Sequence, residues 1–105
     1  MTMNIKAFQE HMEGRLPALD SFYDRAINHQ LEKDKRRPPK KRWSEAKIDR
    51  AANDMYKDLI NSIYEKVKSI VEEHEKKPDS VWFDHLEKYE MYDQINESLY
   101  EIEFE

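Results

Sequence analysis

The chain has 105 residues, a net charge of −5, one glycine and no cysteine, and charged residues make up 39% of it. The lack of cysteine excludes disulfides, Cys-ligated zinc, iron–sulfur clusters and thiol nucleophiles, and the single glycine excludes the phosphate-binding loops of nucleotide enzymes. Leu, Ile, Val and Phe number only 21 residues, so we expect a single domain, residues 1–105, with a thin hydrophobic core.

Two helices are predicted in the N-terminal third. Apolar residues recur at helical spacing after Asn4, a good N-cap, which predicts a helix over residues 5–13. Gly14 and Pro17 then indicate a stop and a restart, with one kinked helix as the alternative. The second helix is expected to end before Lys33, where a charged run leading to two consecutive prolines begins.

The longest predicted helix covers residues 44–75, between the good N-cap Ser44 and Pro78. Its apolar positions advance by about 3.67 residues, close to the α-helical period, so we expect one face to be buried along the whole length. These positions are Ile48, Ala52, Met55, Leu59, Ile63, Val67 and Ile70.

The length of this helix constrains the fold. At 1.5 Å per residue it would extend about 48 Å, whereas a compact domain of this size is about 33 Å across. We therefore expect an all-α fold, a small elongated bundle of three to five helices dominated by this one. A bend in the helix and a homodimer formed through it are the alternatives.

The last third reads as two helical pieces. Apolar residues from Trp82 to Ile102 advance by about 3.3 residues, too few for one continuous stripe, so we expect a helix over 80–92, a break near Asp93 and a second piece from 94. The final five residues alternate acidic and apolar side chains, which predicts a short extended segment. Trp82 and Tyr89 are expected to face inward, and Phe83 outward.

Charge is divided unequally along the chain. Residues 1–70 hold 15 Lys or Arg against 11 Asp or Glu, whereas residues 71–105 hold 3 against 12. An asymmetry of this size indicates a charged partner, or contact between the two parts.

The acidic C-terminal third is the first candidate binding surface. It combines large aromatic side chains, which dominate many interfaces, with carboxylates that would attract a basic partner. The alternative is that the aromatic residues form the core and the acids its solvated side. The candidate contact residues are Trp82, Phe83, Asp84, Glu87, Glu90, Tyr92, Asp93 and Glu97.

The basic Pro-containing connector, residues 33–43, and the turn of helix after it form the second candidate. Residues 33–50 contain nine Lys or Arg against three acids. The cations could contact phosphates, and an aromatic ring could stack on a base. The alternative is a solvated connector, and the acidic remainder of the chain argues against a polyanion. The candidate residues are Lys35, Arg36, Arg37, Lys40, Lys41, Arg42 and Trp43.

No catalytic constellation, metal site or cofactor site is predicted. No two of the four histidines stand three or four residues apart, so no helical His pair can share a metal ion. No stretch is long and apolar enough for a membrane span or a secretory signal, so we expect a cytoplasmic protein that does not bind membranes.

The leading hypothesis is a small acidic protein-binding protein, a regulator or inhibitor that occupies a basic surface of a partner, such as a nucleic-acid-binding groove. In size and composition the chain is similar to small acidic proteins carried by phages and mobile elements. The alternatives are a nucleic-acid-binding accessory module that uses residues 33–50, and a scaffold subunit that assembles with copies of itself.

Overall fold

The structure, a computed structural model, describes residues 2–104, which form five α-helices and one short 3₁₀-helix. The molecule measures 52 × 24 × 21 Å, and its radius of gyration is 16.4 Å, against about 13 Å for a compact domain of this length. The predicted all-α, elongated bundle is thereby confirmed. The elements are α1 (Ile5–Glu13), α2 (Pro17–Lys35), η1 (Pro39–Lys41), α3 (Glu45–Val71), α4 (Asp79–Lys88) and α5 (Met91–Tyr100).

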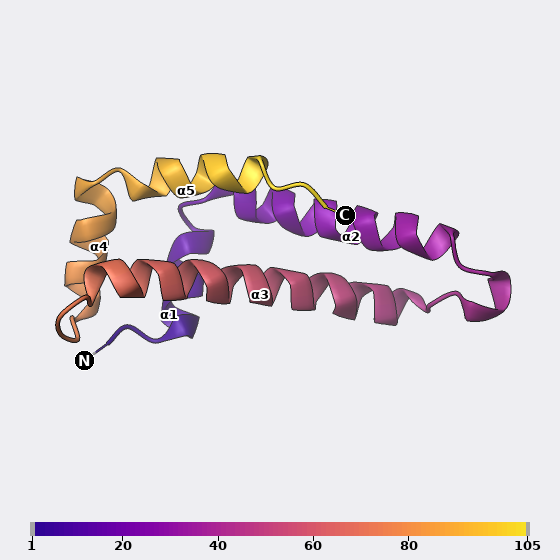
Figure 1. Ribbon diagram of the computed structural model, residues 1–105, viewed down its shortest axis with the longest axis horizontal. Helices are drawn as coiled ribbons and strands as arrows, with labels where there is room; N and C mark the ends of the chain where they lie inside the picture. The colour runs from indigo at the N-terminus through magenta and orange to yellow at the C-terminus, as the bar shows by residue number, and fades with distance from the viewer. Residues whose placement is uncertain (1, 105) are drawn as a thin grey trace.

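The long helices α2 and α3 form an antiparallel hairpin along the longest axis (Figure 1). Helix α5 runs along α2, while α4 and α1 cross the hairpin toward one end. The connection between α2 and α3, which includes η1, forms the other end. The basic connector and acidic α4 lie at opposite ends of the molecule, whereas Glu101 and Glu103 of the acidic third line a hollow beside α2.

The helix starts follow the predicted capping residues. The side chain of Asn4 accepts the backbone N–H of Ala7 at 2.8 Å, and that of Ser44 accepts the N–H of Lys47 at 3.2 Å. Each cap supplies a partner to an N–H group that has none within its helix. Helix α1 ends before Gly14 and α2 begins at Pro17, so the predicted stop and restart is confirmed and the alternative of one kinked helix is wrong. Helix α2 continues to Lys35, past its predicted end, and residues 39–41 form a 3₁₀ turn.

The core, to which all five helices contribute, contains an aromatic cluster where α1, α3 and α4 meet. Trp82 of α4 is fully buried, stacks on Tyr64 of α3 with ring centroids 5.5 Å apart, and meets the edge of Phe8 of α1 at 5.9 Å. Aromatic pairs at these separations add to the free energy gained by burial. Three helices that would each expose an apolar stripe are thereby held together.

The buried face of α3 is only partly the predicted one. Ile48, Ala52 and Val67 are buried as expected, but Met55, Leu59 and Ile63 are half-buried, and 43% of Ile70 is exposed. The core instead receives Tyr56, Ile60, Tyr64 and Val71. The two tyrosines can be buried because their hydroxyls find acceptors, the Glu13 carboxylate at 2.7 Å and the Met3 carbonyl.

Helix α3 ends at Val71, four residues before its predicted end, and Glu72 explains the difference. Its carboxylate accepts hydrogen bonds from the Thr2 hydroxyl at 2.6 Å, and from the Lys77 N–H and the Trp82 indole at 3.0 Å each. Burial opposes ionisation of Glu72, but these hydrogen bonds outweigh it and hold the pKa of this carboxyl below its usual value. Glu72 therefore fixes the connection to α4 and the N-terminal segment at once.

The break in the last third falls before Asp93. Helix α4 ends at Lys88, and Glu90 adopts a left-handed conformation (φ 53°) before α5 begins. The last described residues, 102–104, are irregular, and no strand occurs within residues 2–104. Arg25 of α2 donates hydrogen bonds to the carbonyls of Leu99 and Ile102, and the Phe104 ring lies 5.2 Å from that of Phe22. Side chains of α2, rather than a neighbouring strand, thus hold this segment.

Candidate functional site

The aromatic residues proposed as binding anchors in the acidic third face inward. Trp82 is a core residue, so it cannot contact a partner in this conformation. Phe83, expected outside, stacks on His11 with ring centroids 4.0 Å apart, and the Tyr92 hydroxyl shares a 2.6 Å hydrogen bond with the same imidazole. Tyr89, expected inside, is instead 53% exposed. Packing against His11 of α1, which no pattern within this segment reveals, explains why Phe83 and Tyr92 face inward.

The acidic candidates do lie on the surface. Asp84 and Glu87 of α4, Glu90 between the helices, and Asp93 and Glu97 of α5 are all exposed. Within residues 2–104, none of the ion pairs involves any of them. The acids are therefore free to meet an external cation, but the aromatic anchors predicted beside them are largely absent from that surface.

A groove that the sequence did not predict opens between α3 and α5. It encloses about 470 Å³, and its walls are mainly aliphatic. The α3 wall consists of Leu59, Ser62, Ile63, Lys66, Val67 and Ile70, and the α5 wall of Met91, Gln94, Ile95, Ser98, Leu99 and the following Ile102. A second hollow lined by Ile70, Met91 and Gln94 continues it toward His85 and Tyr89. We call this surface the α3–α5 groove. It explains why much of the predicted core stripe of α3 is incompletely buried.

Exposed acidic residues stand within one helical turn of wall residues on both sides of the groove. Glu97 of α5 and Glu101, just after α5, each follow a wall residue by three positions and are exposed, and Glu101 also lines a hollow beside α2. On α3, Asp58 and Glu65 stand four before and three after the wall residue Ser62 and are also exposed. Residues three or four apart are neighbours on a helix surface. An apolar channel with acidic borders, interrupted by one wall cation, is the result.

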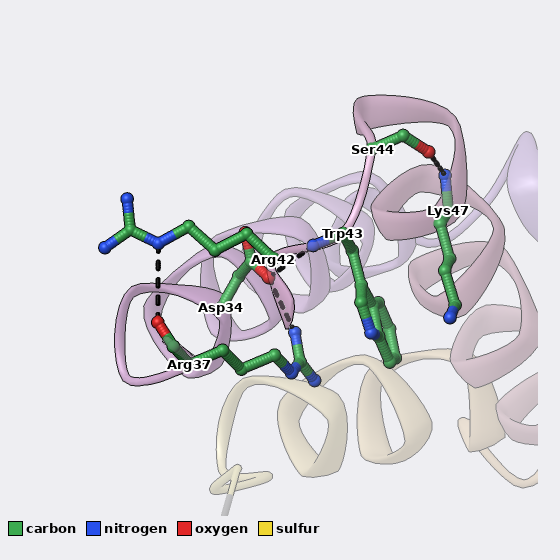
Figure 2. Close-up of polar contacts among 6 residues, drawn as sticks. All are labelled: Asp34, Arg37, Arg42, Trp43, Ser44 and Lys47. Carbon is green, nitrogen blue, oxygen red and sulfur yellow. Dashed lines mark hydrogen bonds and ion pairs between the residues drawn. The ribbon is translucent and has the colours of Figure 1, made fainter. Parts of the chain in front are cut away.

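At the opposite end of the molecule, residues 33–50 form what we call the basic tip, which Asp34 holds in place (Figure 2). The Asp34 carboxylate accepts the backbone N–H of Trp43 and a guanidinium N–H of Arg37, both at 2.9 Å. The hydrogen bond from the Trp43 N–H contributes most to lowering the pKa of this carboxyl. The hydrogen bond and positive charge of Arg37 lower this pKa further. Asp34 thus ties the end of α2 to the residue before the α3 cap.

The indole of Trp43 is covered by two cations. The Arg37 guanidinium lies 3.8 Å and the Lys47 ammonium 4.5 Å from the ring centroid, and Figure 2 shows the indole between these two side chains. Such contacts are attractive because the face of an aromatic ring is electronegative. A nucleobase could stack on Trp43 only by displacing one of them, so the arrangement does not favour the base-stacking role predicted for this residue.

The remaining candidates of the basic tip are on the surface. Lys35, Arg36, Lys40, Lys41 and Arg42 are exposed, whereas Arg37 is half-buried. Lys35 pairs with Glu32 at 3.0 Å. The predicted set is therefore brought together at one end of the molecule, and the candidate list missed Asp34 and Lys47, whose contacts help to order it.

Comparison of the chain with protein-family models, curated proteins and solved structures finds no match. Within residues 2–104, no helix combines the length and apolar character needed to span a bilayer, and no three His, Asp or Glu side chains gather where a metal ion could be held. The α3–α5 groove and the basic tip both present an exposed surface to a binding partner.

Proposed function

We propose that this protein binds a partner protein by receiving an amphipathic, basic helix of that partner in the α3–α5 groove. By covering such a segment it would act as a regulator or inhibitor of the partner. The observation that carries the proposal is the half-buried aliphatic lining of the groove, in a chain that has few aliphatic residues.

Because the chain has few aliphatic residues, leaving several of them partly exposed in this lining forgoes much of the free energy of burial available to the fold. Only 21 residues of the chain are Leu, Ile, Val or Phe, yet Leu59, Ile63, Ile95 and Ile102 are only partly buried, and Ile70 is exposed. Full burial of an exposed aliphatic side chain contributes about 1.5–3 kcal/mol, so each of these partly buried residues would add a fraction of that on binding. A contiguous apolar surface of this kind is typical of an interaction site.

The dimensions of the groove fit a short helix. From Met91 to Ile102 the α5 wall extends about 17 Å, at 1.5 Å per residue, which corresponds to about three helical turns of an occupant. Helices dock in such grooves through apolar residues at positions i, i+3, i+4 and i+7. The acidic borders favour an occupant that carries Lys or Arg beside its apolar stripe.

The test is binding of a fluorescein-labelled 14-residue peptide of Leu and Lys, with Leu at helical spacing, measured by fluorescence anisotropy. The double variant Ile63→Ser/Ile70→Ser should weaken binding about tenfold or more, because apolar burial is lost. The matched control, Ile5→Ser/Val81→Ser, alters two partly exposed aliphatic residues outside the groove and should bind as the parent does.

A second pair of measurements checks the charge. Glu97→Lys/Glu101→Lys should weaken the Leu/Lys peptide several-fold and strengthen binding of a Leu/Glu peptide of the same pattern. Equal binding of a scrambled Leu/Lys peptide would contradict the proposal, since spacing would then be irrelevant. It would also be contradicted by sedimentation of the parent as a dimer that Ile63→Ser/Ile70→Ser converts to a monomer, because the groove would then be a self-association surface.

A further inference from the structure

We infer that the basic tip is a second, independent binding site, for the phosphodiester backbone of double-stranded nucleic acid. The argument rests on the order of the tip, the state of its cations and their distance from the acidic end. None of these depends on what the α3–α5 groove binds.

The tip is ordered before any ligand arrives. The two hydrogen bonds to Asp34, the Ser44 cap and the 3₁₀ turn at Pro39–Lys41 fix the path of the chain between α2 and α3. Two consecutive prolines restrict the same turn further. A site of this kind loses little conformational entropy on binding, unlike a flexible basic arm.

Most cations of the tip are available. Among residues 2–104, ion pairs at the tip involve Lys35 and Arg37. The other exposed cations form none, although Arg42 approaches the Arg37 carbonyl at 3.5 Å and Lys47 lies against the indole. Those without such a contact are Lys33, Arg36, Lys40, Lys41 and Arg50. Cations that have no acidic partner within the protein can contact phosphates and displace condensed counterions from nucleic acid.

The distance between α4 and the tip reduces the main objection to a polyanion, although Glu101 and Glu103 lie nearer, beside α2. The overall charge of −5 would repel a polyanion if it were spread evenly. The tip, however, lies at one end of a 52 Å axis, and α4 lies at the other. Charges interact weakly in solution beyond about 8 Å at physiological ionic strength. The local charge of residues 33–50, nine cations against three acids, therefore governs what approaches the tip.

The covered indole decides between duplex and single strand. Single-stranded nucleic acid is bound largely by stacking of bases on aromatic rings, and the faces of Trp43 are taken by Arg37 and Lys47. A duplex offers phosphates without requiring a stacking platform. We therefore expect contacts to phosphates, little dependence on base sequence and a strong dependence on salt.

The experiment is fluorescence anisotropy with two unrelated 20-base-pair DNA duplexes over a series of salt concentrations. Both duplexes should bind alike, with a slope of log K against log salt of about −4.5, as expected for about five phosphate contacts. Lys40→Ala/Lys41→Ala should reduce the magnitude of this slope by about 2. The matched control, Lys57→Ala/Lys88→Ala, removes two exposed cations outside the tip and should leave the slope unchanged.

Several outcomes would overturn the inference. They are no duplex binding at low salt, an equal loss in the control variant, and tighter binding of a single strand that Trp43→Leu abolishes. Stronger binding to phosphatidylserine vesicles than to duplex would assign the tip to membranes instead. Ile63→Ser/Ile70→Ser should leave duplex binding intact, so failure at the tip and failure at the groove are distinguishable.

Discussion

The two ends of the molecule are ordered by different forces. At the acidic end, Trp82 packs among aromatic rings from α1 and α3 and is fully buried. At the basic tip, a carboxylate and two cation–aromatic contacts organise the chain, and the described hydrophobic cluster contains no residue from 28 to 51. Order at one end therefore depends on the global fold, whereas order at the other depends on a few local polar contacts.

The substitution expected to destabilise the acidic end most is Trp82→Ala. Replacing a fully buried tryptophan by alanine should lower the free energy of unfolding by about 4 kcal/mol, a large part of the total for a small domain. Tyr89→Ala, which truncates an exposed ring on the same helix–turn segment, should change it by less than about 0.5 kcal/mol. Urea denaturation measures both, and equal effects would refute the core role of Trp82.

The corresponding change at the tip is Asp34→Ala. It leaves the Trp43 N–H without its acceptor and should destabilise the tip by about 1 kcal/mol, with roughly fivefold faster amide exchange at Trp43. Exchange in the middle of α3 should not change, because the tip lies beyond the hydrophobic cluster. Asp49→Ala, an exposed acid of the same segment, is the control. Unchanged exchange at Trp43 in Asp34→Ala would contradict the assigned role of Asp34.

The smallest expected effect is the dependence of stability on pH through His11, which lies at the acidic end. Burial, and then the positive charge of Arg15, lowers the pKa of His11 from its usual value of 6.5. Below pH 6.5 the unfolded chain binds more protons at this position than the folded chain, so stability should fall as the pH falls. Well above that pH His11 is neutral in both states and makes no such difference.

Denaturation of the parent and of His11→Gln between about pH 5.5 and 7.5 measures this dependence. The variant should lose part of the decrease, whereas His74→Gln, on the exposed α3–α4 connector, should retain it. Identical pH profiles for the parent and His11→Gln would show that His11 does not couple protonation to folding.

The features that could be predicted from the sequence are those that depend on residues close together in the chain. Asn4 and Ser44 cap their helices as expected, and the long helix forces an elongated shape. The choice of buried face on α3 could not be predicted, because a tyrosine can be buried only when its hydroxyl finds an acceptor. The acceptors of Tyr56 and Tyr64 lie 43 and 61 residues away in the chain.

The two candidate surfaces differ in the same way. The basic tip is visible in the sequence as a run of cations, although the role of Asp34 depends on a contact nine residues away. The α3–α5 groove belongs to no single segment, since its walls come from helices that are joined through α4. Its only sequence signal is that α3 carries more apolar residues than one buried face can use.

The placement of opposite charges at the two ends of an elongated molecule also affects how it meets a ligand. It gives the protein an electric dipole along its longest axis. In the field of a polyanion this dipole produces a torque, which turns the cationic end forward before contact. The acidic helices then point away from the polyanion, so a second macromolecule can reach them while the first is engaged.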